Sequence, residues 1–432
     1  MALYCACRCR RSAADDGVRE PASEARRAAA VGTPLITSRI RAALEQKASS
    51  VGFALCGVAA VPEPGSPAEQ LQRDRFVLWA QQGFAGDMAW LLRTDEDGVP
   101  MRSSLHRAVP WARSVILCAV NYNAAQPTSL QAAPAGSGWI ARYAWSGTAT
   151  PDGGSVRPTD YHDVLLRGLR EVEAELYAAL PESAREATQT RAYVDTGPVV
   201  ERWFAQLAGI GWIGKNTCVL NQGQGSWMLL GVILTSLPLA DEAVLLPAAD
   251  RCGTCTRCID ACPTDALVAP RQMDASRCIA YLTIEKKGSI AEDLREGMGR
   301  QVFGCDICQD VCPWNRRAPV GTHPALQART ELVNPALETL AAMNNAAFKA
   351  AFRGSPLERT GRKRLQRNVA IAMGNSGDLQ HRERLQEWAS GDDAVLAESA
   401  AWALTRLGKN VTDVDPETLK DRSALLASGG PT

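Results

Sequence analysis

The residues best suited to chemistry in this sequence are two short cysteine runs. The first, "CGTCTRCIDACP", covers residues 252–263, and the second, "CDICQDVCP", covers residues 305–313. The C-x2-C-x2-C-x3-C-P spacing of the first run is that of bacterial ferredoxins. There, three thiolates of a run hold one [4Fe–4S] cluster and the fourth cysteine holds another. The first run therefore predicts a second set of ligands elsewhere in the chain.

The second run and one cysteine between the runs complete a predicted set of two clusters. The first cluster is assigned to Cys252, Cys255, Cys258 and Cys312, and the second to Cys262, Cys278, Cys305 and Cys308. Two four-cysteine zinc sites are the alternative. Structural zinc usually takes two separated C-x2–4-C pairs, and a proline after each run has no function there. The pattern favours two [4Fe–4S] clusters, which would carry electrons toward the rest of the chain.

The densest polar stretch upstream is "YVDTGPVVERWFAQLAGIGWIGKNTCVLNQGQGSW" at residues 193–227. Asp195 ends an apolar segment, and ligands of α/β sheets bind beside strand ends. An aspartate before a Gly-Pro turn also serves as a cap or turn residue. The segment "GIGWIGKN" lacks G-x-G-x-x-G spacing after a strand, so it is weak evidence for a nicotinamide site. Its glycines either let the backbone approach a flat cofactor or shape turns.

The elements that must position these residues can be predicted from apolar periodicity. The segments at 113–122 ("RSVILCAVNY") and 226–237 ("SWMLLGVILTSL") predict buried strands. The segment at 161–180 predicts a long amphipathic helix that Pro181 ends. Strands alternating with helices indicate an α/β domain. Within it, residues 146–160 predict a Gly/Pro-rich surface loop.

Beyond the cysteines the chain becomes helical. Residues 361–408 carry apolar helical faces interrupted by "GNSGD" and "GDD", which indicates a HEAT-like helical repeat that packs on neighbouring helices. The predicted organisation is a disordered extension at 1–36, a catalytic α/β domain at 37–245, a ferredoxin-like two-cluster module at 246–322, and a helical HEAT-like domain at 323–432.

The overall charge gives no global attraction to nucleic acid, because Lys+Arg and Asp+Glu both total 47. A local basic run is present at 349–367, where Glu358 is the only acid. It is either a solvated face or a phosphate-binding surface. No apolar run is long enough to span a bilayer, and the first residues lack the apolar core of a secretory signal. The 14 cysteines are therefore expected in a reducing cytoplasm.

Several long motifs together resemble one known family. They are "VDTGPVVERWFAQLAGIGWIGKNT", "CIAYLTIEKKG" and "GCDICQDVCPWN", and the resemblance to the epoxyqueuosine reductases covers about residues 37–410. It implies an α+β, nitroreductase-like domain that binds cobalamin, beneath the two-cluster module. It also implies a monomer that takes electrons from an external donor and reduces epoxyqueuosine to queuosine at the wobble position of tRNA.

The resemblance also implies residue roles. Cob(II)alamin would be reduced through the clusters, and Asp195, in the "VDTG" motif, would be the proton donor. Six further residues are expected to contact cobalamin: Arg102, Tyr143, Lys215, Asn216, Ser226 and Tyr281. In the basic run, we expect Arg362, Lys363 and Arg364 to bind tRNA.

One departure from the family pattern and two rival functions remain. The D-x-H-x-x-G motif that supplies a cobalt-binding histidine is absent, so His162 is expected to be an ordinary helix-start residue and no histidine to bind cobalt. A reductive dehalogenase-like cobalamin enzyme is one rival, although such enzymes commonly carry a twin-arginine signal. A plain electron carrier is the other, and it would leave the large α/β domain without a function.

Overall fold

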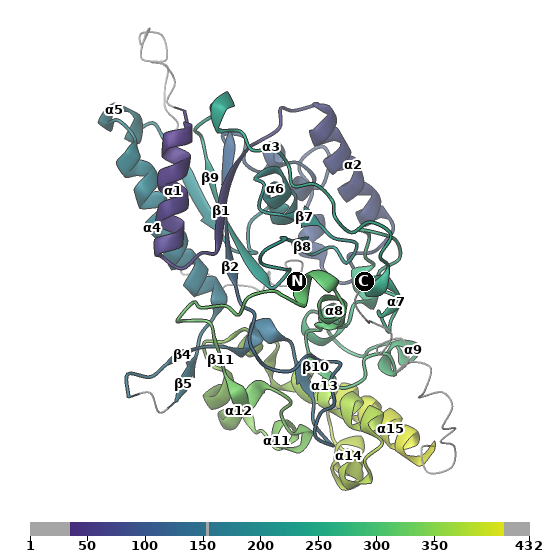
Figure 1. The fold of residues 1–432 in the computed structure, drawn as a ribbon. Helices are drawn as coiled ribbons and strands as arrows, with labels where there is room; N and C mark the ends of the chain where they lie inside the picture. Colours follow the sequence, from purple (N-terminus) through teal and green to yellow (C-terminus); the bar gives the residue numbers. More distant parts are fainter. Residues whose placement is uncertain (1–34, 153–154, 410–432) are drawn as a thin grey trace.

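The structure is a computed structural model, and it describes residues 35–152 and 155–409 (Figure 1). The disordered extension predicted at 1–36 therefore lies outside the described residues, except for its last two positions. Of these, Ile36 is fully buried and forms a parallel bridge with Leu239. Among the described residues, no helix has both the length and the apolar character that crossing a membrane requires.

A four-stranded sheet forms the centre of the first half of the chain. Its order is β1 (Leu55–Ala60), β2 (Ser114–Asn121), β9 (Met228–Thr235) and β6 (Thr190–Tyr193). The two long strands, β2 and β9, coincide with the two predicted apolar segments and are buried along their whole length. All three pairings are antiparallel. The mixed helix-and-strand fold is confirmed, and the domain is of the α+β type.

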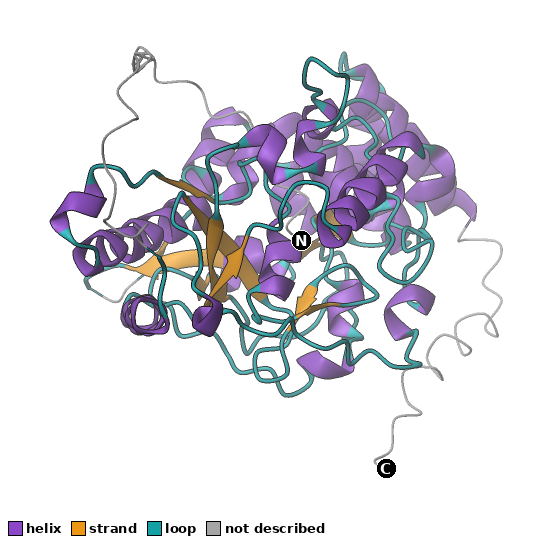
Figure 2. Ribbon diagram, turned by 90° about the horizontal axis from the view of Figure 1, so that it is seen from above, coloured by secondary structure: helices purple, strands orange, loops and turns teal. Residues whose placement is uncertain are grey.

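Helices cover both faces of this sheet, which explains why its central strands are apolar on both sides. In β2, Ile116 and Cys118 pack with α1 (Ser38–Ser50) and α4 (Tyr161–Ala179), whereas Val115 and Leu117 pack with α6 (Glu201–Leu207). Helix α4 confirms the predicted amphipathic helix. Figure 2 shows the strands on one side of the molecule and most of the helices gathered beside them.

The expectation of a surface loop at 146–160 is wrong in part. The segment contains two strands of an antiparallel hairpin, β4 (Ser146–Ala149) and β5 (Val156–Pro158). Strand β11 (Gln327–Ala328) adds to its other edge. The Gly/Pro-rich composition belongs to the turn of the hairpin, and backbone pairing with a segment 180 residues away in sequence is invisible to local composition.

The cysteine-rich segment is built from short helices joined by loops. These are α7 (Arg257–Asp260), α8 (Ile279–Ile284), α9 (Glu292–Arg295) and α10 (Ile307–Asp310). Strand β10 (Gln301–Phe303) pairs in parallel with β3 (Trp139–Ile140), which joins the segment to the α+β domain. The α+β domain also contains the longer helix α2 (Pro67–Gln81) and four short elements: α3 (Leu105–Ala108), α5 (Glu182–Arg185), β7 (Trp212–Ile213) and β8 (Val219–Leu220).

The C-terminal part is helical, as predicted, and its helices end where the glycine-containing breaks occur. The elements are α11 (Leu337–Ala341), α12 (Asn345–Phe352), α13 (Gly361–Ser376), α14 (Arg382–Ala389) and α15 (Ala394–Lys409). Gly377 ends α13 with φ 68°, a conformation that glycine adopts without strain. One continuous apolar core joins α13 and α15 to β3, β10 and α4.

Candidate functional site

Asp195 lies two residues beyond β6, at the edge of the central sheet. Its φ is 57°, in the left-handed region that Asp and Asn tolerate better than most residues. The side chain is buried, with 7% of the residue exposed. Tyr161 donates a hydrogen bond to Asp195 Oδ2 at 2.5 Å, and His162 Nε2 lies 3.9 Å from the same oxygen. Burial raises the pKa of Asp195, although the charge of His162 and the Tyr161 hydrogen bond oppose it.

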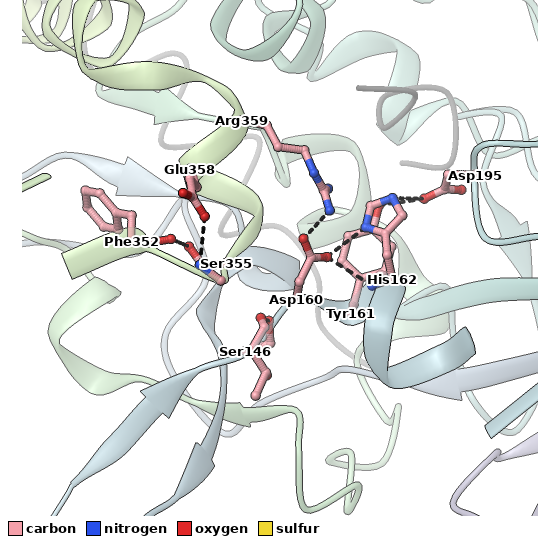
Figure 3. A network of polar contacts seen from close by, with 11 residues as sticks. Ser146, Asp160, Tyr161, His162, Asp195, Phe352, Ser355, Glu358 and Arg359 are labelled. Atoms are coloured by element: carbon pink, nitrogen blue, oxygen red, sulfur yellow. Dashed lines mark hydrogen bonds and ion pairs between the residues drawn. The ribbon is translucent and has the colours of Figure 1, made fainter. Parts of the chain in front are cut away.

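The start of α4 holds His162 in this position. Asp160 is the N-cap of the helix: its Oδ1 accepts from the His162 backbone N–H at 3.0 Å and lies 2.8 Å from His162 Nδ1. Its other oxygen pairs with Arg359. Burial alone would raise the pKa of Asp160, but the contacts with His162 and Arg359 hold it at about 2. Figure 3 shows the chain of contacts from Arg359 through Asp160 and His162 to Asp195.

A second buried carboxyl group lies beside Asp195, on the first turn of α6. Glu201 is 4% exposed, and burial raises its pKa to about 7, with Arg102 lowering it and Asp195 raising it. Arg102 donates to the backbone oxygens of Gly197 at 2.5 Å and Val199 at 3.1 Å, so it braces the segment between Asp195 and α6. Both carboxyl groups therefore favour the protonated form more than free side chains do.

The other predicted cobalamin contacts divide between this network and the cysteine loops. Tyr143 is buried, and its ring centroid lies 5.9 Å from that of Tyr161, so it belongs to the Asp195 network. Tyr281 is also buried, but its hydroxyl accepts a hydrogen bond from the Asp87 backbone at 2.7 Å, in the loop that follows α2. The hydrogen bond of Tyr281 thus connects it to the loop after α2 and not to Asp195.

Lys215, Asn216 and Ser226 lie at the junction with the cysteine-rich segment. Lys215 Nζ donates to the backbone oxygen of Gly253 at 2.7 Å, and Asn216 Nδ2 to that of Cys308 at 3.3 Å. Ser226 Oγ donates to Gln309 Oε1 at 2.9 Å. These side chains hold the loops that carry the predicted cluster ligands against the α+β domain. Their role toward cobalamin stays a prediction.

The glycines of "GIGWIGKN" have a structural explanation. A Cβ on Gly211 would lie 2.2 Å from the backbone oxygen of Leu220, and one on Gly214 would lie 2.5 Å from the Leu220 side chain. The close approach of β7 to β8 therefore requires a glycine at 211, because the contact there is with backbone. An approach of these glycines to a cofactor stays a prediction.

The thiols assigned to the first cluster are neighbours in space. Burial, with the nearby thiols of Cys252 and Cys255, raises the pKa of Cys258 to about 11. Burial, with Cys258 and Cys252, likewise raises the pKa of Cys312 to about 12. Thiols of such high pKa are neutral near pH 7, and a bound metal cation would favour their ionised form.

The thiols assigned to the second cluster are neighbours too. Burial raises the pKa of Cys305 well above its usual value, and the thiols of Cys278 and Cys262 add to this effect. Cys218, which is not among the predicted cluster ligands, is buried and in contact with Cys308. Within the described residues, no group of three or more His, Cys, Asp or Glu side chains is placed to hold a single metal ion.

The basic run at 349–367 is less uniform than its sequence suggests. Arg364 donates to the backbone oxygens of Ile284, Arg359 and Thr360, and Arg367 is 1% exposed. Both guanidinium groups are thus used within the fold. Lys363 is 77% exposed and pairs with Asp393 at 2.9 Å, and Arg362 bonds to side chains at 345 and 366.

Sequence reasoning missed several members of the site. His162 does begin a helix, as expected, but its ring also faces Asp195, and Tyr161 donates to the same carboxylate. Glu201 and Arg359 were not singled out for this site. The "DYH" triplet was a usable signal, because an N-cap aspartate two residues before a histidine places both side chains at one helix end.

Two family models match the chain. One, described as "Epoxyqueuosine reductase QueG, DUF1730", matches residues 102–196, and the other, "4Fe-4S double cluster binding domain", matches residues 251–315. The epoxyqueuosine reductase of Xanthomonas campestris is 36% identical over 364 residues, which cover 84% of this chain and 94% of the relative. The chain belongs to the epoxyqueuosine reductase family. It is therefore an oxidoreductase, and it contains a double iron–sulfur cluster domain.

Other epoxyqueuosine reductases agree with this membership. The Escherichia coli enzyme is 32% identical over 376 residues, covering 86% of this chain and 91% of the relative. A crystal structure of an epoxyqueuosine reductase with an epoxyqueuosine-modified tRNA-Tyr stem loop matches with a TM-score of 0.71 at 29% identity, covering 91% of this chain and 95% of that one. A Bacillus subtilis epoxyqueuosine reductase, described with its catalytic aspartate loop swung out of the active site, matches with a TM-score of 0.70 at 28% identity, covering 88% and 96%.

Proposed function

We propose that this protein reduces epoxyqueuosine to queuosine in tRNA, with Asp195 as the proton donor. The observation that carries the proposal is a buried carboxyl group of raised pKa, held by Tyr161 and His162 two residues beyond a strand of the central sheet. A relative of this family has been crystallised with an epoxyqueuosine-modified tRNA stem loop, which supports tRNA as the substrate.

The reaction requires an acid. Conversion of the epoxide to an alkene and water consumes two electrons and two protons. The C–O bonds break readily only if the oxygen is protonated as it leaves, and a positioned acid contributes on the order of 10²- to 10⁴-fold to such a step. Asp195 suits this role, because burial keeps a larger fraction of its carboxyl protonated near neutral pH. The catalytic aspartate loop described for the Bacillus subtilis relative supports the same assignment.

The electrons would enter through two [4Fe–4S] clusters. The proposed ligands of the first are Cys252, Cys255, Cys258 and Cys312, and of the second Cys262, Cys278, Cys305 and Cys308. The neighbouring thiols of each set support the assignment, and Asn216 links the backbone of one ligand loop to the α+β domain. An external donor would reduce the clusters.

Cobalamin would be the group that the clusters reduce. Beside Arg102, the buried Ser103 Oγ and Glu201 Oε1 have no hydrogen-bond partner within the described residues. Cobalamin carries amide side chains around its ring, and their N–H groups can donate hydrogen bonds to buried carboxyl and hydroxyl oxygens such as these. Bound cobalamin would supply low-valent cobalt as the two-electron reductant. The chain's own contribution is to seat the modified nucleoside, exclude water and hold the proton on Asp195.

The decisive experiment compares the purified protein with Asp195→Asn. Each is incubated without oxygen with cobalamin, a chemical reductant and tRNA that bears epoxyqueuosine, and nucleosides are quantified by mass spectrometry. We expect queuosine from the wild type and a loss on the order of 10²-fold or more in the variant. Asn is the right replacement because it tolerates the positive φ of this position, which Ala would adopt at a cost of about 1 kcal/mol.

Controls separate the parts of the proposal. Equal iron and sulfide content and equal corrinoid binding in both proteins would show that the variant retains its cofactors. Wild-type turnover by Asp195→Asn would contradict the role of the acid. A wild-type protein that is colourless when purified without oxygen would contradict the electron path.

A further inference from the structure

One contact of the site comes from the far end of the chain. Arg359 closes a short helical turn of the C-terminal part, the 3-10 segment Pro356–Arg359, and its guanidinium reaches the Asp160 carboxylate at the start of α4. The two residues lie 199 positions apart in sequence. Figure 3 shows Arg359 pointing away from its own segment and toward Asp160. This ion pair ties the C-terminal helices to the element that carries His162.

The two carboxylate oxygens of Asp160 bind different partners. One oxygen pairs with Arg359, and the other lies against both the backbone N–H and Nδ1 of His162. An ionised carboxylate at Nδ1 fixes the tautomer and the orientation of the ring. With Nδ1 held in this way, Nε2 is the nitrogen that faces Asp195.

Arg359 is suited to hold this carboxylate in place. Its side chain is only partly exposed, and the pair is shielded more than a surface ion pair, since Asp160 is 11% exposed. The backbone of Arg359 is fixed in turn, because its carbonyl oxygen accepts a hydrogen bond from Arg364 at 3.0 Å, and Arg364 also donates to Ile284 of α8. A half-buried guanidinium with an anchored backbone loses little freedom when it binds a carboxylate.

We propose that Arg359 is a positioning residue for the reaction: it holds Asp160, which orients the His162 imidazole toward Asp195. The inference depends on the proposed function of Asp195. In this arrangement the position of the C-terminal helices affects the geometry around Asp195. Arg359 belongs to the basic run, but it contributes to the active site and does not bind a tRNA phosphate. His162 Nε2 then faces the carboxyl group that would give up the proton.

The test is a kinetic comparison of Arg359→Gln, Arg359→Lys and wild type under the anaerobic assay. For Arg359→Gln we expect kcat to fall on the order of 10-fold, as for other residues that orient a reacting group through a second side chain. KM for tRNA and the affinity for the tRNA stem loop should stay within about twofold of wild type. Arg359→Lys should recover part of kcat, because it restores the charge without the planar fork.

A double-substitution cycle identifies the route of the effect. If Arg359 acts through the imidazole, Arg359→Gln should cause no further loss of kcat in a His162→Gln background, whereas independent effects would multiply. The matched control is Arg384→Gln on α14, a half-buried arginine that pairs with Glu338 outside this network. It should keep wild-type kcat. Asp160→Asn breaks the same chain from the other side and should match Arg359→Gln.

The outcomes are distinct. Normal kcat with weakened tRNA binding in Arg359→Gln would overturn the inference and make Arg359 a phosphate contact, and so would multiplicative losses in the double variant. Activity of Asp195→Asn would overturn the proposed function itself. If Arg359→Gln does not accumulate as folded protein, Asp160→Asn and Arg359→Lys decide the question, and wild-type kcat in both would overturn the inference.

Discussion

At the scale of single residues, the unusual feature is a pair of buried carboxyl groups, Asp195 and Glu201, that share one arginine. Burial raises the pKa of each, while Arg102 braces the backbone between them. A carboxyl group whose pKa is higher in the folded than in the unfolded protein stabilises the fold at low pH. That contribution is lost as the pH rises through the folded value.

Glu201 gives this argument a measurable form. Its pKa rises from 4.5 to about 7 on folding, so its ionisation should reduce stability between those pH values, by at most ~3 kcal/mol. We expect Glu201→Gln to raise the thermal midpoint relative to wild type at pH 8.5, and to do so much less at pH 5. The cofactor-loaded proteins are compared by the loss of cluster absorbance on heating. An equal difference at both pH values would show that the ionisation of Glu201 does not limit stability.

The sequence predicted some of these residues and missed others for a physical reason. Asp195 was recognisable because it sits in a long motif that ends a strand. His162 and Arg359 become members of the site only through side-chain contacts between a helix start and a segment almost 200 positions later. Local periodicity and capping rules carry no information about such contacts.

At the scale of elements, helix α13 shows how a basic sequence can be structural. Arg367 donates to the backbone oxygens of Leu282, Lys286 and Gly288 at 2.5, 2.9 and 2.7 Å. Those oxygens lie at the end of α8 and in the loop that follows it, where helical carbonyls lack partners. The Arg367 side chain of α13 therefore caps the C-terminal end of α8.

This capping predicts a large loss of stability. Arg367→Ala should lower the free energy of unfolding by about 3 kcal/mol or more, because it leaves several buried carbonyls without donors. Lys363→Ala, four residues earlier on the same helix and 77% exposed, should cost less than about 1 kcal/mol. Thermal midpoints of both variants and wild type provide the comparison. A small effect of Arg367→Ala would mean that water replaces the guanidinium in the capping interaction.

The elements themselves could be predicted where the signal is local. Strands β2 and β9 were recognisable because each is a continuous apolar run, and helix α4 because its apolar residues recur with a helical period. The antiparallel order of the sheet and the third strand of the β4–β5 hairpin were not, because β11 joins that hairpin from the C-terminal part. Pairing between distant segments depends on the whole fold.

At the scale of the whole molecule, the basic run separates into two groups that face different partners. Arg364 and Arg367 bind backbone oxygens inside the fold, and Arg359 binds Asp160. The exposed cations that remain are Lys349, Arg353 and Lys363, on and beside α12 and α13. Lys349 and Arg353 are available to phosphates, whereas Lys363 pairs with Asp393. The earlier set of Arg362, Lys363 and Arg364 is a poor choice for a binding test, because replacing Arg364 would also disturb the contact with α8.

The exposed group makes a prediction that is independent of catalysis. Replacing Lys349 and Arg353 with Gln should weaken binding of the tRNA stem loop and lower the slope of log affinity against log salt by about 2, because each phosphate contact contributes close to one unit. At saturating tRNA, kcat should stay near wild type, which is the opposite of the result expected for Arg359→Gln. Arg384→Gln is again the control, since its charge is already paired with Glu338. An unchanged salt slope in a normally folded variant would mean that Lys349 and Arg353 interact only with solvent. The tRNA-binding surface would then lie on another face of the molecule.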